Sequence, residues 1–194
     1  MPRTYFHLDP ENPVAQRFWG RIPLQHAASF LHFTKGGMVQ RLMHDLKYRE
    51  KSAIGTKFGK LYAQELTMPG SLIKGIDAIV PVPLHWKRQR ERGYNQCDII
   101  AEGMSEVMSV PVFTKAIERR VENISQTRFD RFGRWKNVED IFRVKQPELL
   151  EGRHILLLDD TITTGATLEA CGTGILAASA SKLSVAAIAS AGTI

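Results

Sequence analysis

Short apolar runs alternate with amphipathic segments along most of this chain. Apolar stretches bounded by glycine, proline or charged residues predict buried strands, and these stretches are 24–34, 76–82, 155–158 and 183–189, with a shorter one at 112–114. Segments with apolar residues at helical spacing predict helices at 37–48, 51–67, 94–108 and 167–178. This alternation indicates an α/β domain with a mostly parallel central sheet that helices cover on both faces.

The two ends of this pattern differ in character. Residues 1–23 contain four prolines and no clear period, so we expect an irregular N-terminal arm. Residues 24–194 form the expected α/β domain. Within it, residues 115–142 form a long connection, and a segment of that length without clear secondary structure is usually functional.

Composition excludes several classes of protein. The 194 residues are 43% hydrophobic and 24% charged, which is the balance of a globular protein and not of a disordered or fibrous one. No apolar run approaches the roughly 18 residues that a membrane span needs. The N-terminus lacks the apolar stretch of a signal peptide, so we expect a cytoplasmic protein. Cys97 and Cys171 are too few for a disulfide scaffold, and both are expected in the core.

The net charge of +6 is concentrated in two segments. Residues 85–92 carry four basic residues against one acidic residue, and residues 115–136 carry seven against three. Such concentration suggests an anionic partner, and both phosphorylated small molecules and nucleic acids fit it. Solvated basic loops without a partner are the plain alternative, and charge alone favours them.

The strongest chemical signal is the sequence LLLDDTITTGAT at 156–167. An apolar strand ends in Asp159 and Asp160, and a threonine- and glycine-rich loop then leads into a helix. Free N–H groups and the positive end of a helix dipole suit a phosphate, and Gly165 allows the backbone to approach an anion closely. The carboxylates would repel that phosphate, so they suit sugar hydroxyls or Mg²⁺ beside it. The segment therefore indicates a ligand that combines a phosphate with a ribose.

Two other interpretations of this segment are weaker. The acids could merely begin a turn and the threonines cap a helix, which would be the preferred interpretation of an isolated pair of aspartates. The complete twelve-residue arrangement argues against it. The segment is also not a Walker loop, because the glycine–lysine–serine/threonine sequence is missing.

At this point the sequence resembles a known family. LLLDDTITTGAT is similar to the phosphoribosyl pyrophosphate (PRPP) motif of type I phosphoribosyltransferases. VPVPLHWKRQRERGYNQ at 80–96 and NISQTRFDRFGRWKNVEDIF at 123–142 resemble the ComF/GntX branch of that group, which is named for competence protein F. The second stretch is similar to a mobile hood that covers the site in this branch. The resemblance covers about residues 30–190 and implies the type I phosphoribosyltransferase fold, with a hood at about 115–142.

The resemblance also implies roles for particular residues. Asp159 and Asp160 would be the catalytic acids, contacting the ribose and Mg²⁺ directly or through water. The 5′-phosphate would be bound by Thr161, Thr163, Thr164, Gly165, Ala166 and Thr167. The pyrophosphate would be bound by His85, Arg88, Arg90 and Arg92, although a structural role is the stronger expectation for the histidine and plain surface charge an equal one for Arg90 and Arg92. Hood contacts would come from Gln126, Arg128 and Arg131, for which a solvated helix face is an equal alternative.

One feature departs from the family pattern. Members of this branch commonly begin with a four-cysteine zinc module, whereas this sequence has no cysteine before Cys97. The arm at 1–23 is then expected to be the remnant of a missing module, lost naturally or by truncation. Any function of that module is in doubt for this chain.

Two classes of function remain open at this stage. The first is an enzyme that uses Mg²⁺ to transfer phosphoribose from PRPP to an unknown nucleophilic acceptor with release of pyrophosphate. The second is a non-catalytic accessory protein of DNA uptake that binds PRPP, a nucleotide or single-stranded DNA, with competence proteins as partners. Trp86 and Trp135 lie in the basic segments, where they could stack on bases. A homodimer is compatible with either class.

Overall fold

The computed structural model describes residues 1–48, 52–121, 141–178 and 180–192. The helical elements are η1 (Phe6–Leu8), α1 (Pro13–Gln16), α2 (Met38–Tyr48), α3 (Ser52–Leu66), α4 (Trp86–Arg92), α5 (Gln96–Met108), η2 (Pro147–Leu149) and α7 (Ala166–Ala177). The strands are β1 (His26–Phe33), β2 (Ala78–Pro81), β3 (Ile117–Arg119), β4 (Phe142–Val144), β5 (His154–Ile162) and β6 (Lys182–Ala191).

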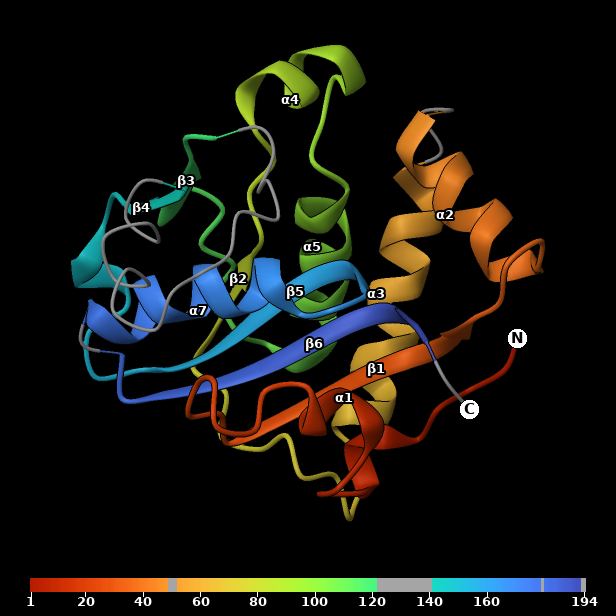
Figure 1. Cartoon of the computed structure of the whole chain (residues 1–194), viewed down its shortest axis with the longest axis horizontal. Coiled ribbons are helices and arrows are strands. Elements are labelled where there is room, and N and C mark those ends of the chain that lie inside the picture. The colour runs from red at the N-terminus through yellow and green to blue at the C-terminus, as the bar shows by residue number, and fades with distance from the viewer. Residues whose placement is uncertain (49–51, 122–140, 179, 193–194) are drawn as a thin grey trace.

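Four parallel strands form the central sheet in the order β1-β6-β5-β2 (Figure 1). The predicted α/β class with a parallel sheet is therefore confirmed. β5 is longer than the apolar run 155–158 that predicted it and continues through the two aspartates to Ile162. Because the strands are parallel, the carboxyl ends of β2 and β5 lie at the same edge, which is where ligands bind in open α/β sheets.

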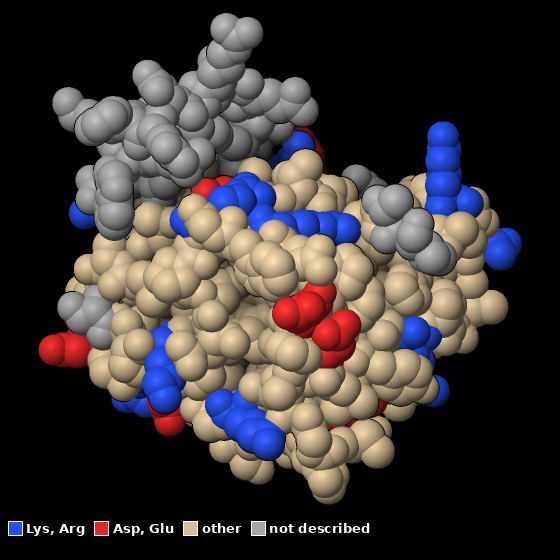
Figure 2. Space-filling model, turned by 60° about the horizontal axis from the view of Figure 1, so that its bottom comes forward, with Lys and Arg blue, Asp and Glu red and all other residues tan. Residues whose placement is uncertain are grey.

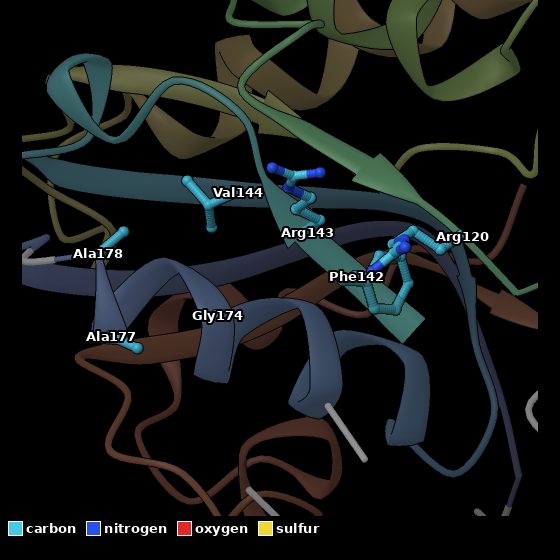
Figure 3. Close-up of a pocket in the computed structure, with 7 residues that line it drawn as sticks. All are labelled: Arg120, Phe142, Arg143, Val144, Gly174, Ala177 and Ala178. Carbon is cyan, nitrogen blue, oxygen red and sulfur yellow. The ribbon is translucent and has the colours of Figure 1, made fainter. Parts of the chain in front are cut away.

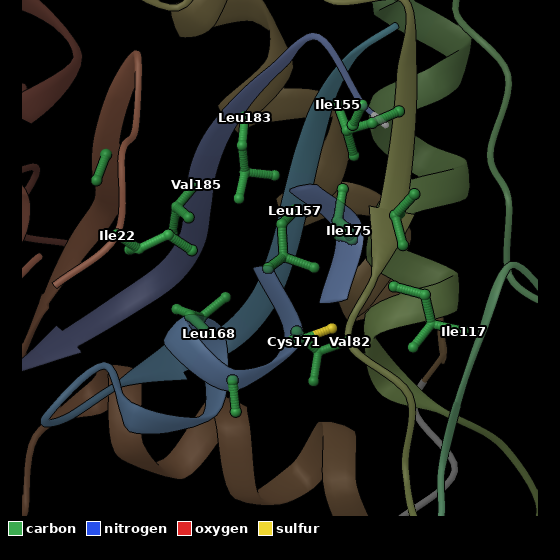
Figure 4. Packing of buried hydrophobic residues seen from close by; sticks show 14 of the residues in the cluster. Ile22, Val82, Ile117, Ile155, Leu157, Leu168, Cys171, Ile175, Leu183 and Val185 are labelled. Atoms are coloured by element: carbon green, nitrogen blue, oxygen red, sulfur yellow. The ribbon is translucent and has the colours of Figure 1, made fainter. Parts of the chain in front are cut away.

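Helices cover both faces of the sheet, as predicted. On one face, α2, α3 and α5 bury Leu156 and Leu158 of β5. On the other face, α7 packs on Leu157, and Figure 4 shows Leu157 and Val185 lying together with Leu168 and Ile175. None of these helices, nor any other in the described part of the chain, is long and apolar enough to cross a membrane.

Helices α3 and α5 lie against each other through two glycines. A Cβ atom on Gly59 would lie 2.1 Å from the carbonyl oxygen of Ile100, and one on Gly103 would lie 2.4 Å from that of Thr56. Any side chain at these positions would push the helices apart. The contact fixes the position of the N-terminus of α5, which follows the basic segment.

The N-terminal arm, residues 1–23, is built into the domain. The N–H of Thr4 donates to Phe30 O at 3.1 Å and that of His32 to Pro2 O at 3.0 Å, so the arm covers the outer edge of β1. Further along, Asn12 caps α1: its Oδ1 accepts two backbone N–H groups of that helix, and its Nδ2 donates to Ala27 O at 2.9 Å. The arm, predicted to be irregular, thus contains two short helical segments, η1 and α1, that pack against β1.

Three local predictions need correction or fall outside the structure. Residues 85–92, predicted as a loop, contain α4, because His85 caps its start and Gly93 ends it in the left-handed region at φ 77°. The strand predicted at 112–114 is a single bridge from Val112 to Ile79, because the chain turns again at once. The predicted connection 115–142 contains a small antiparallel sheet of β3 and β4, while residues 122–140, most of the predicted hood, lie outside the described residues.

Candidate functional site

The two predicted acids lie side by side in the last part of β5. Asp159 and Asp160 follow five buried residues of that strand, so they reach the carboxyl edge of the sheet. Successive residues of a strand point to opposite faces. The two side chains therefore have different neighbours although they are adjacent in the sequence.

Asp160 is buried and held by two donors. Its Oδ2 accepts a hydrogen bond from Gln96 Nε2 at 2.7 Å and lies 2.8 Å from Lys47 Nζ. Burial opposes the charge on Lys47, but the nearby carboxylates of Asp160 and Asp159 outweigh it and raise the lysine pKa. Asp160 is only 5% exposed, and the paired lysine and amide satisfy this oxygen. It therefore ties α2 and α5 to β5.

Asp159 is more exposed than Asp160, and its surroundings disfavour a negative charge. Its Oδ1 accepts the N–H of Asp160 at 2.7 Å and lies 3.7 Å from Cys97 Sγ. Burial and the negative charge of Asp160 raise the Asp159 pKa to about 7. Burial, followed by the same carboxylates, raises the pKa of the Cys97 thiol well above its ordinary value, which keeps the thiol protonated. Asp159 is thus a carboxyl group that can gain or lose a proton near neutral pH.

The basic helix α4 is linked to this acid pair through one amide. Arg92 Nη1 donates to Gln96 Oε1 at 3.1 Å, and the Nε2 of the same glutamine donates to Asp160. Arg88 is half-buried and Arg90 is exposed on the same short helix. His85 is buried, and its Nδ1 accepts the N–H of Lys87 at 3.4 Å as the cap of α4. The structure therefore brings Arg92 into the acid network and gives His85 a structural contact.

The predicted phosphate-binding segment divides into strand, loop and helix. Thr161 lies within β5, paired with Ala189 of β6. Residues 163–165, which we call the anion loop, follow the strand, with Thr163 and Thr164 exposed. Gly165 precedes α7 in the left-handed region at φ 80°, where glycine is favoured. Ala166 and Thr167 form the first turn of α7, and the N–H of Ala166 donates to Thr164 Oγ1 at 3.4 Å.

Sequence reasoning missed two residues of the site, Lys47 and Gln96. Lys47 lies in the last turn of α2, more than 100 residues from the acids, and no local pattern indicates its contact. Gln96 is the first residue of α5 and the last of the stretch 80–96 that carries the family resemblance, so its position was the available signal. The predicted hood residues Gln126, Arg128 and Arg131 lie outside the described residues.

A separate pocket of about 370 Å³ lies at the far half of α7 (Figure 3). It is lined by Arg120, Phe142, Arg143, Val144, Gly174, Ala177 and Ala178. None of these residues belongs to the acid pair or the anion loop. Among the described residues, no group of three or more histidine, cysteine or acidic side chains is arranged as a metal site.

Basic side chains do not form one continuous area on the face that Figure 2 presents. Lysine and arginine occur there as separate groups, with acidic side chains near the middle of the face. Strips of basic residues along an exposed face are typical of proteins that follow a nucleic-acid backbone.

Comparison with known proteins finds several relatives of this chain. No family model matches the chain. DNA utilization protein YhgH of Escherichia coli K12 is 29% identical over 171 residues, which are 87% of this chain and 71% of that protein. Competence protein F of Haemophilus influenzae is 33% identical over 93 residues, covering 47% of this chain and 41% of that protein. Competence protein ComFC of Bacillus subtilis is 29% identical over 144 residues, covering 70% of this chain and 52% of that protein.

The chain is similar to proteins of the ComF family. Similarity to solved structures bears on the fold independently. Glutamine PRPP amidotransferase from B. subtilis, complexed with ADP and GMP, aligns with a TM-score of 0.51 and 18% identity over 74% of this chain. A second solved structure, titled as the allosteric regulatory enzyme of purine biosynthesis, aligns with the same TM-score and 17% identity. The aligned regions are only 30% and 29% of those enzymes' chains. At this identity the similarity establishes the type I phosphoribosyltransferase-like fold and no more.

Proposed function

We propose that this protein binds PRPP with Mg²⁺ at the carboxyl edge of β5 and transfers its phosphoribosyl group to a nucleophilic acceptor. The observation that carries the proposal is the position of an acid pair beside an exposed loop at a helix N-terminus. The anion loop and the first turn of α7 present N–H groups and the positive end of a 12-residue helix. That arrangement suits the 5′-phosphate.

The acids support the remainder of the ligand in different ways. Among the described residues, Asp159 Oδ2 has no hydrogen-bond partner, whereas Asp160 Oδ2 already has Lys47 and Gln96. Mg²⁺ keeps most of its water and commonly uses one or two carboxylates together with substrate oxygens. Asp159 fits such a role, and Asp160 fits that of an anchor. Bound Mg²⁺ would neutralise charge on the departing pyrophosphate.

The chemistry needs positioning and charge stabilisation more than a protein nucleophile. A bond forms between the acceptor and the ribose C1, the bond from C1 to the pyrophosphate oxygen breaks, and the electron pair leaves with pyrophosphate. The acceptor loses a proton. Arg92 would support the negative leaving group, and its link through Gln96 to the acid pair favours this role. The buried, protonated Cys97 is not suited to nucleophilic attack.

Calorimetric titration with PRPP, with and without Mg²⁺, tests the binding step. Wild-type protein is expected to bind PRPP more tightly with Mg²⁺, and Asp159→Asn is expected to lose that gain. Asp98→Asn is the matched control, because burial also raises the Asp98 pKa to about 7 but the side chain bonds to Asn95 instead. Equal Mg²⁺ effects in all three proteins would contradict the assignment of Asp159. Release of pyrophosphate in a screen of bases and amines then tests transfer.

A second function is favoured by the names of the relatives. Proteins named for DNA utilization and competence match this chain, and the basic helix α4 carries Trp86, which is 60% exposed. Aromatic and basic residues together bind single-stranded DNA without sequence preference. The protein would then be an accessory factor of DNA uptake that keeps the fold without turnover.

Removing two arginines of α4 distinguishes the two functions. Under the enzyme proposal, Arg90→Ala/Arg92→Ala weakens PRPP binding more than tenfold. Binding of ribose 5-phosphate stays nearly unchanged, because only PRPP carries the pyrophosphate. Each lost charge-assisted hydrogen bond costs about 1.5–3 kcal/mol. Under the DNA proposal, the same variant keeps its affinity for PRPP but loses affinity for single-stranded DNA. Its remaining DNA binding depends less on salt concentration. Lys57→Ala/Lys74→Ala, two exposed lysines outside α4, is the control.

A further inference from the structure

The N-terminal arm contacts the anion loop through an arginine at residue 17. Arg17 Nη1 donates to the carbonyl oxygen of Thr163 and, at 3.4 Å, to that of Ile162. Its Nη2 donates to the carbonyl oxygen of Ala191 at 2.9 Å. One guanidinium therefore joins the loop after β5 to the end of β6.

A second arginine, Arg21, holds the other side of the loop. Its Nη1 donates to the carbonyl oxygens of Thr164 at 3.0 Å and of Arg17 at 2.8 Å. Its Nε donates to Glu169 Oε2 at 3.0 Å, and the two side chains form an ion pair. Glu169 lies in the first turn of α7, where its charge would oppose an anion. Arg21 therefore both fixes the loop and offsets that charge.

The ring of Phe18 closes the arm side of the loop. A Cβ atom on Gly165 would lie 2.9 Å from two carbons of the Phe18 ring, which is 2% exposed. Gly165 is itself buried although its two threonine neighbours are exposed. A ligand can therefore approach the loop only from the side away from the arm.

The direction of the carbonyl groups fixes the direction of the N–H groups. In a trans peptide, the C=O of one residue and the N–H of the next point in opposite directions. Since the carbonyls of Thr163 and Thr164 point to the two arginines, the N–H groups of Thr164 and Gly165 point away from the arm. Neither N–H group has a hydrogen-bond acceptor among the described residues. They are free to bind an anion on the open side.

We propose that Arg17 and Arg21 are positioning residues that hold the anion loop in a form able to bind a phosphomonoester, which makes the arm a working part of the ligand site. The inference rests on the proposed function and adds the arm to it. Without the arginines, the carbonyl oxygens of Thr163 and Thr164 would lose these donors, and the loop could turn them toward the ligand. An electronegative loop would repel the phosphate.

The geometry requires an arginine at position 17. Its two terminal nitrogens donate to two separate segments, whereas a lysine has a single nitrogen on a flexible stem. Charge is therefore not sufficient for this role. The comparison of Arg17→Met with Arg17→Lys separates positioning from a simple electrostatic effect.

Titration with ribose 5-phosphate and amide NMR test the inference together. Arg17→Met and Arg17→Lys are each expected to weaken the binding of ribose 5-phosphate at least tenfold. Both should also shift the amide NMR signals of Thr164 and Gly165. Arg3→Met is the matched control, because Arg3 is also a part-buried arm arginine but pairs with Glu65, away from the loop. It should change affinity less than twofold and leave both signals in place. Thermal unfolding confirms that each variant is folded at the assay temperature.

The possible results separate this inference from the proposed function. Wild-type affinity in either Arg17 variant, or an equal loss in Arg3→Met, overturns the positioning role. If wild-type protein binds neither ribose 5-phosphate nor PRPP, the proposed function fails. The amide signals then still decide the role of the arm: unchanged signals in Arg17→Met overturn it, and shifted signals support an arm that shapes the loop.

Discussion

Asp159 and Asp160 show how adjacent identical residues acquire different chemistry. Asp160 accepts from Gln96 and pairs with Lys47, so a cation and an amide compensate its burial. Asp159 has a backbone N–H and a thiol beside it, and its pKa rises to about 7. The fold thus leaves one acid as a fixed anchor and the other available for protonation or a ligand.

The raised Asp159 pKa predicts a loss of stability with rising pH. An unfolded aspartate has a pKa of about 3.9. The folded protein therefore holds a proton that the unfolded chain releases between about pH 4 and 7, and stability falls across that window. Asp159→Asn removes this contribution, so its melting temperature should exceed that of the wild type by more at pH 8 than at pH 5. The expected difference is several degrees, since 1 kcal/mol is about 2–4 °C at this size.

Other groups in the same region define the control. Asp160, Lys47 and Cys97 face Asp159, and the nearby Asp98 also has a pKa raised to about 7 by burial. Asp98→Asn should remove a separate part of the decrease in stability with rising pH. If the difference in melting temperature between wild type and Asp159→Asn stays the same from pH 5 to pH 8, Asp159 is ionised throughout that range and the prediction is wrong.

The sequence predicted the residues of this site where the signal is local. The acid pair, the loop and the start of α7 are contiguous at 156–167, and the pattern indicated their order. Lys47, Gln96 and the arm arginines could not be predicted in these roles, because their contacts depend on how α2, α5 and the arm are placed against β5. His85 was expected more strongly as a structural residue, and in the structure its Nδ1 accepts the N–H of Lys87.

Individual elements explain the main differences from prediction. Residues 87–92 are all polar, and Trp86 is the one apolar residue of the segment 86–92, so no apolar period marked it as a helix. Its helical state is instead consistent with the capping contact of His85 and the left-handed Gly93. The longer helices α3 and α5 had apolar periods and were predicted, but their close contact through Gly59 and Gly103 was not.

The glycine contact between α3 and α5 predicts a strong effect of a single methyl group. Gly59→Ala should lower the free energy of unfolding by about 1–3 kcal/mol, because the added Cβ meets backbone atoms that cannot move alone. Gly174→Ala in α7 is the control: its Cβ would meet only Val144 Cγ2, at 3.8 Å. Because alanine has a higher helix propensity than glycine, the Gly174→Ala change should be neutral or stabilising by up to about 1 kcal/mol. Urea unfolding measures both, and equal effects would contradict the close packing.

At the scale of the whole molecule, the arm and the sheet share one core. Val14, Phe18 and Ile22 of the arm are buried in the same cluster as Leu168 and residues of β5 and β6. The arm also covers the outer edge of β1, which would otherwise present unpaired backbone groups. We therefore expect the arm and the sheet to unfold together.

Substitution of neighbouring aromatic residues tests this shared core. Phe18→Ala should cost about 3–5 kcal/mol of stability, because the ring is 2% exposed. Trp19→Ala, at a residue that is 59% exposed, should change stability by about 0.5 kcal/mol or less. In the Phe18 variant, Trp fluorescence and far-UV circular dichroism should report one common transition. Two separated transitions would mean that the arm unfolds independently.

The hydrogen bond from Arg17 to Ala191 has a consequence for synthesis of the chain. The two residues are 174 positions apart, and a ribosome adds about 5–20 residues per second. The arm therefore leaves the ribosome roughly 10–35 s before its partner strand exists. During that interval Val14 and Phe18 have no core to enter, and β1 lacks its neighbour β6. Nascent chains should consequently expose apolar surface to chaperones until translation reaches β6, and the pairing of β6 should complete the four-stranded sheet in one late step.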